Sequence, residues 1–64
     1  MVFKEKLLYV RALLNLTQAE LAEQLSVSYE TINRWENGKF NPSKKAEYSF
    51  DIFCKQHNII FDDR

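Results

Sequence analysis

The chain has 64 residues, 45% of them hydrophobic, and nine lysines and arginines balance nine acidic residues to a net charge of zero. This length allows one domain that buries about 60% of its unfolded surface, and a single glycine and a single proline argue against an all-β or disordered chain. One cysteine excludes an internal disulfide, and without a signal or membrane-length apolar run we expect a cytoplasmic protein.

The first predicted helix covers about residues 2–14. Its apolar residues recur every three or four positions, which is typical of a helix with one buried face. The stripe consists of Phe3, Leu7, Val10 and Leu14, widened by Leu8, Tyr9 and Leu13. Asn15 follows and can end the helix in the left-handed conformation.

The second predicted helix begins at Gln18, because Thr17 and Glu20 have the spacing of a capping box. Its inward residues are Leu21, Ala22 and Leu25. The helical spacing is interrupted at residues 26–28, where Ser28 can cap a third helix over residues 29–37.

The third predicted helix has two different faces. Its inward residues are Ile32, Trp35 and the stem of Glu36, and its outward residues are Glu30, Asn33, Arg34 and Asn37. Gly38 can close it in the left-handed conformation. Residues 18–37 therefore predict a helix-turn-helix, which presents its second helix to DNA.

A loop and a last helix follow. Asn41 and Pro42 favour a helix start, and the helix is expected over about residues 43–56 with Ala46, Phe50, Phe53 and Cys54 at helical spacing. Residues 58–64 form a C-terminal tail, in which residues 59–61 either fold back on the core or form a hydrophobic dimer contact. His57 has no second ligand at metal-binding spacing, so we predict no metal site.

Several of these features resemble one known family. They are Arg11, residues 18–25, Ile32, and the run W-E-N-G-K followed by Pro42 and Ser43. The chain resembles the Xre/Cro family of bacterial and phage repressors over roughly residues 5–57. The resemblance implies a compact all-α, lambda-repressor-like DNA-binding domain of four to five helices, occupying residues 1–64 as a single domain.

The resemblance also carries details. It implies a structural ion pair between Arg11 and Glu36. The last helical region allows one helix or two, and because the family has two shorter helices there, we expect an element that is kinked or divided near residues 48–51. The family usually has glycine where this chain has Ser26, at a position that favours positive φ. A serine there costs about 1 kcal/mol relative to glycine.

The residues expected to read bases lie at the N-terminal end of the third helix, which is the end that enters the major groove. They are Ser28, Tyr29, Glu30, Asn33 and Arg34. Arg34 can bind guanine, Asn33 can pair with adenine, and Glu30 can accept from the cytosine amino group. The four-residue spacing of Glu30 and Arg34 also predicts an ordinary surface ion pair, and the two uses are compatible.

Other polar residues are expected to contact the DNA backbone. They are Gln18, Thr31, Asn37, Lys39 and Lys44. Gln18 begins a helix, where the dipole favours an anion, and the resemblance implies contacts by Asn37, Lys39 and Lys44. Residues 1–45 hold seven basic and five acidic residues, whereas residues 46–64 hold two and four. We therefore expect a weakly binding, salt-sensitive monomer that reads DNA as a two-fold homodimer.

The leading hypothesis is a repressor-like, sequence-specific DNA-binding transcriptional regulator, with helix 29–37 in the major groove of double-stranded DNA. Two alternatives stay open: a protein-interaction module of the antitoxin or anti-repressor type, and the DNA-targeting module of a larger DNA-modifying enzyme. The sequence offers no acid/base pair, no nucleophile beside a histidine and no glycine loop for phosphate. We predict no catalysis, no cofactor and no small-molecule ligand.

Overall fold

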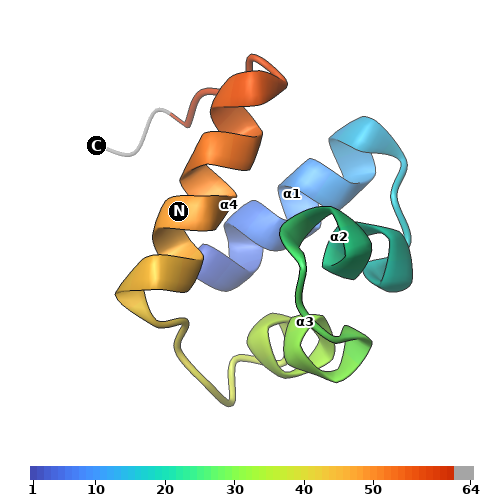
Figure 1. Cartoon of the computed structure of the whole chain (residues 1–64), viewed down its shortest axis with the longest axis vertical. Helices are drawn as coiled ribbons and strands as arrows, with labels where there is room; N and C mark the ends of the chain where they lie inside the picture. Colours follow the sequence, from blue (N-terminus) through green and yellow to red (C-terminus); the bar gives the residue numbers. More distant parts are fainter. Residues whose placement is uncertain (62–64) are drawn as a thin grey trace.

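Four helices make up most of residues 1–61, the part of the chain that the computed structural model describes. They are α1 (Phe3–Leu14), α2 (Gln18–Leu25), α3 (Tyr29–Glu36) and α4 (Lys44–Gln56). α3 lies at one end of the molecule, and the C-terminal end of α4 lies at the other (Figure 1). The expected all-α fold class is confirmed, with four helices in the described residues.

Local hydrogen bonds set the ends of the helices. The Thr17 hydroxyl accepts from the Glu20 amide at 3.1 Å, and the Glu20 carboxylate accepts from the Thr17 amide at 2.9 Å. This is the predicted capping box, and α2 begins at Gln18 as expected. Asn15 ends α1 with a φ of 56°, also as expected.

The turn between α2 and α3 is three residues long. Ser26 adopts the left-handed conformation with a φ of 58°, which a serine holds at a cost of about 1 kcal/mol. The Val27 amide donates to the Ala22 carbonyl at 3.0 Å, and the Ser28 hydroxyl accepts from the Thr31 amide at 3.2 Å. These bonds end one helix and begin the next, so they fix the angle at which α3 leaves α2.

The core draws side chains from all four helices. Its buried members are Leu7, Val10, Leu21, Ala22, Ile32, Trp35, Phe50, Phe53, Cys54 and Ile59. Phe3 packs edge-on against Trp35 and Phe50, with ring centroids 5.3 and 5.2 Å away. Because α2 and α3 have only eight residues each, this packing stabilises them.

Three apolar residues of α1 lie outside the core, contrary to the expected wide stripe. Leu8, Tyr9 and Leu13 are 43%, 45% and 55% exposed. No helix of the described residues packs over that side of α1, so the buried stripe is narrower than the sequence suggests.

α4 differs from its prediction in its continuity but not in its bounds. It is one continuous helix of 13 residues, so the expected kink or division near residues 48–51 is wrong. It begins at Lys44, because the Ser43 hydroxyl accepts from the Ala46 amide at 3.1 Å. The predicted range of about residues 43–56 is therefore confirmed to within one residue.

The segment after α4 folds back on the core. Ile59 is buried, and the Phe61 ring lies 5.8 Å from the ring of Tyr9 on α1. Ile60 points away and is 89% exposed. Residues 62–64 of the expected tail lie outside the described residues. Across residues 1–61, no helix is both long and apolar enough to cross a membrane.

Candidate nucleic-acid interface

α3 divides into a buried face and an exposed face. Ile32 and Trp35 are buried in the core. Tyr29 and Arg34 are exposed on the other side, and Tyr29 keeps 50% of its surface accessible. The helix therefore uses its apolar side to attach itself and leaves a polar side at the end of the molecule.

Arg11 and Glu36 join α1 to the end of α3. Arg11 Nε donates to Glu36 Oε2 at 2.7 Å and Nη2 donates to Oε1 at 2.9 Å. Arg11 Nη1 donates to the Leu16 carbonyl at 3.2 Å. The Glu36 side chain is only 6% exposed, so both carboxylate oxygens are matched by protein donors rather than by water.

A chain of amide side chains extends from this ion pair along α3. Gln18 Nε2 donates to Glu36 Oε1 at 2.7 Å, and Gln18 Oε1 accepts from Asn33 Nδ2 at 3.4 Å. Asn33 Oδ1 in turn accepts from Asn37 Nδ2 at 2.9 Å. Sequence reasoning missed this link, because residues 18 and 33 lie on different helices and their spacing carries no signal.

The network changes how three of the candidate residues can meet DNA. Gln18 and Asn33 are half-buried and already bonded, whereas Asn37 is exposed. The Gln18 and Asn33 amides each carry two N–H groups, of which one is used within the network. A contact with DNA through the second N–H would add to the network. Because the Asn33 carbonyl oxygen has two lone pairs, a bidentate contact with adenine is compatible with the bond from Asn37.

Ser28 and Thr31 form the start of the exposed face. Their hydroxyl oxygens lie 2.9 Å apart, and the Ser28 oxygen also accepts from the Thr31 amide. Both hydroxyls are therefore oriented by the N-cap of α3.

Arg34 has a different neighbour from the one its spacing predicts. Within the described residues, no ion pair joins it to Glu30, and its Cζ instead lies 5.6 Å from the centroid of the Phe40 ring. Phe40 is 57% exposed in the loop after α3, and sequence reasoning did not single it out. An aromatic residue two positions beyond the closing Gly38 is the signal that could have found it.

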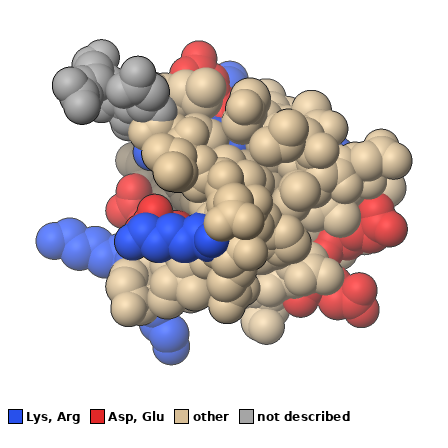
Figure 2. Space-filling view, turned by 90° about the horizontal axis from the view of Figure 1, so that it is seen from above, with Lys and Arg blue, Asp and Glu red and all other residues tan. Residues whose placement is uncertain are grey.

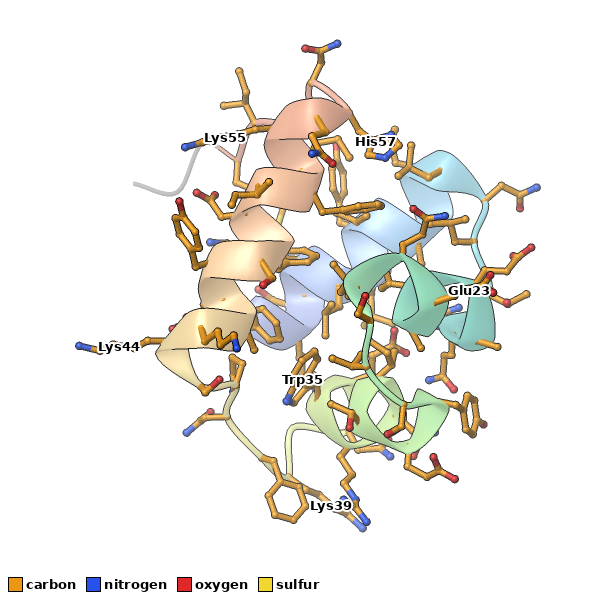
Figure 3. All side chains as sticks on the ribbon, in the orientation of Figure 1. Glu23, Trp35, Lys39, Lys44, Lys55 and His57 are labelled. Atoms are coloured by element: carbon orange, nitrogen blue, oxygen red, sulfur yellow. The ribbon has the colours of Figure 1, made fainter. Side chains whose placement is uncertain are left out.

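The two lysines among the expected backbone contacts lie in different places, one near α3 and one on the far side of the start of α4 (Figure 3). Lys39 lies at the same end of the molecule as α3, and Lys44 projects from the first turn of α4 (Figure 3). Both side chains are exposed. The exposed ammonium groups of Lys39 and Lys44 can therefore approach phosphates.

The charges are unevenly distributed over the molecule. Acidic side chains lie on the side of α2, which carries Glu20 and Glu23, whereas lysines project from the opposite side, where acidic side chains lie among them (Figure 2). The face turned away from α3 is mostly uncharged (Figure 2). A polyanion is therefore disfavoured on the exposed side of α2 that carries Glu20 and Glu23.

The described residues offer little material for other chemistry. Cys54 is buried, and desolvation, with a smaller effect from Asp51, raises the pKa of its thiol to about 11. The thiol is therefore protonated at neutral pH and is a poor nucleophile. Residues 1–61 contain no group of three or more histidine, cysteine or acidic residues that could hold a metal ion.

Comparisons with known proteins agree with this arrangement. The family model described as Helix-turn-helix matches residues 7–46. An uncharacterized HTH-type transcriptional regulator of Methanocaldococcus jannaschii is 50% identical over 78% of this chain and 76% of that protein. Another, from Archaeoglobus fulgidus, is 53% identical over 84% of this chain and 89% of its own length.

A longer relative matches nearly the whole chain. The HTH-type transcriptional activator BcrR of Enterococcus faecalis is 50% identical over 98% of this chain, but the match covers only 29% of the activator. No solved structure matches the chain significantly.

Proposed function

The chain belongs to the Xre/Cro-type helix-turn-helix family, and from this premise we propose that it is a DNA-binding transcriptional regulator that places α3 in the major groove. The observation that carries the proposal is that α3 has one buried face and one exposed face. Ile32 and Trp35 fix it to the core, while Tyr29 and Arg34 are left at an accessible end of the molecule. A helix held in this way can enter the groove without being pulled from its own domain.

The exposed face of α3 carries groups suited to reading base edges. Arg34 can donate twice to guanine, and Glu30 can accept from the cytosine amino group. Tyr29 and Ser28 stand at the helix start, which approaches the bases first. Asn33 can pair with adenine through its second N–H and through the remaining lone pair of its carbonyl oxygen, beside the bond from Asn37.

Backbone contacts frame this helix and set its register. We assign Lys39, Lys44 and Asn37 to phosphates beyond the C-terminal end of α3, and Thr31 to a phosphate near its start. Gln18 bonds to Asn33 and Glu36, so we assign it to a phosphate beside the second half of α3. Since the net charge of the chain is zero, these contacts must come from the local distribution of charge. We expect binding by one copy to be weak at physiological salt.

Two copies would strengthen binding. Successive major-groove faces on one side of a duplex lie about 34 Å apart. The longest Cα extent of the chain is 27 Å, so two copies at that spacing would touch only along their edges. We therefore propose a two-fold homodimer that forms on the DNA rather than one with a large interface in free solution.

A titration against duplex DNA at several salt concentrations tests the function. Arg34→Ala is expected to cost about 1–3 kcal/mol on a preferred site and to leave binding to random sequence nearly unchanged. Lys39→Ala should weaken binding to all sequences about equally and reduce the slope of log K against log salt by about one. Fluorescence anisotropy with a labelled duplex measures both effects.

Two results would contradict the proposed DNA binding. If neither variant changes binding, or if the unaltered protein ignores duplex DNA even at low salt, α3 is not a DNA reader and the protein-interaction alternative is favoured. Lys55→Ala, at the far end of α4, is the matched control for loss of one positive charge.

We propose a DNA-binding protein rather than an enzyme. The match to less than a third of BcrR also keeps the targeting-module alternative open, in which this fold directs a longer protein to DNA. Repressor-like action and a cytoplasmic location stay predictions. Selection of bound oligonucleotides from a random pool would give the preferred site and show whether it is a palindrome.

A further inference from the structure

Phe40 is a large apolar residue that the core does not use. It lies in the loop between α3 and α4, is 57% exposed, and takes no part in the buried cluster. Its ring faces the Arg34 guanidinium, with 5.6 Å from Cζ to the ring centroid. A cation–π contact of this kind restricts the orientation of the guanidinium.

The end of α3 sets the position of Phe40. The Lys39 amide donates to the Arg34 carbonyl at 3.3 Å, and the Gly38 amide donates to the Trp35 carbonyl at 3.1 Å. Together with the φ of 72° at Gly38, these bonds form a Schellman motif, which turns the chain back over the last turn of the helix. Phe40 follows directly, so the backbone itself returns the ring to Arg34.

We propose that Phe40 is a second specificity-determining residue, which holds Arg34 in the plane of a guanine and contacts the C5-methyl group of an adjacent thymine. The inference rests on the proposed function, because it requires Arg34 to read a base in the major groove. A residue outside α3 would then take part in recognising the bases. The protein would prefer a particular pair of adjacent bases rather than a single base.

The position of the Phe40 ring relative to the Arg34 guanidinium leads to this preference. A guanidinium that donates to guanine O6 and N7 lies in the plane of that base. The Phe40 ring, whose centroid lies 5.6 Å from Cζ, is then displaced from the guanine towards a neighbouring base pair, since bases are spaced by about 3.4 Å along the strand. At that level thymine presents its methyl group in the major groove, and an aromatic ring is an apolar partner for it.

Deoxyuridine tests the methyl contact, because it pairs like thymine and lacks only the C5-methyl group. The site is first selected with the unaltered chain, and the thymine beside the guanine that Arg34 reads is then replaced. We expect the unaltered protein to bind the deoxyuridine duplex about fourfold more weakly. Phe40→Ala should bind the thymine duplex about tenfold more weakly and should not distinguish the two duplexes.

A control variant and a stability measurement isolate the effect. Leu13→Ala removes an exposed apolar side chain from α1, and it should keep both the affinity and the methyl sensitivity of the unaltered protein. Phe40→Ala should unfold at nearly the same urea concentration as the unaltered protein, because the ring is not part of the core.

The inference is overturned if Phe40→Ala binds the selected site as tightly as the unaltered protein does. It is also overturned if the deoxyuridine duplex weakens the binding of both proteins by the same factor, or if the selected site has no thymine beside that guanine. These results differ from a failure of the proposed function. If Arg34→Ala keeps full sequence preference, the assignment of α3 fails and this inference fails with it. If Arg34→Ala loses preference while Phe40→Ala does not, only the role of Phe40 is removed.

Discussion

Replacing Arg11 by alanine is expected to lower the free energy of unfolding by about 3 kcal/mol. The substitution removes two donors from a Glu36 carboxylate whose side chain is 6% exposed, and water cannot fully replace them there. A domain of this size has a total stability of roughly 3 to 10 kcal/mol, so the loss is a large part of it. Urea unfolding followed by circular dichroism measures the change.

Two further variants separate the buried pair from an ordinary one. Lys55 Nζ lies 3.4 Å from Asp51 Oδ2 on the surface of α4, and the two side chains are 76% and 59% exposed. Lys55→Ala should therefore change stability by less than about 0.5 kcal/mol. Joint replacement of Arg11 and Glu36 by methionine leaves no unpaired charge and should recover most of the stability that Arg11→Ala loses. An Arg11→Ala variant no less stable than Lys55→Ala would show that the pair does not hold α3 in place.

Ile32→Ala should lower the free energy of unfolding by about 3 kcal/mol, because it leaves a cavity at a fully buried position of α3. Tyr29→Ala, three residues earlier on the exposed side of the same helix, should cost less than about 1 kcal/mol. DNA binding should show the reverse order. At a temperature where both proteins remain folded, Tyr29→Ala weakens binding and Ile32→Ala keeps it.

Thermal unfolding and DNA titration of the same two preparations test this reversal. Equal losses of stability would mean that α3 has no distinct inward face. Weaker DNA binding by folded Ile32→Ala than by Tyr29→Ala would mean that the face meeting the duplex has been assigned to the wrong side.

The parts of the fold that depend on local sequence could be predicted. The positive φ of Ser26 follows from the family resemblance. The Thr17–Glu20 capping box, the left-handed residue Asn15 and the inward side of α3 each depend on residues within one or two turns of each other. Such interactions are visible as spacing in a single sequence.

The parts that depend on distant neighbours could not be predicted. Leu8 and Leu13 have the right spacing for a core stripe, but whether another element covers them is a property of the whole fold. The continuity of α4 is likewise decided by its packing, since its sequence allows one helix or two.

The candidate site shows the same division between local and distant interactions. The exposed residues of α3 follow from helical spacing, whereas the Gln18–Asn33 bond joins two helices across a turn. The Arg34–Phe40 contact depends on the way the chain reverses after Gly38, which places a loop residue beside a helix residue. The Gln18–Asn33 bond has no spacing that a sequence pattern could reveal, whereas the aromatic residue two positions after Gly38 is a local signal for Phe40.

Mapping the amide chemical shifts of the ¹⁵N-labelled protein during addition of duplex DNA at low salt tests the placement of the interface most directly. We expect the largest changes at residues 28–40 and at Lys44, and little change on the exposed side of α1 at Leu8 and Leu13 or at Ile60. Changes concentrated on that side of α1, with residues 28–40 unmoved, would contradict the account.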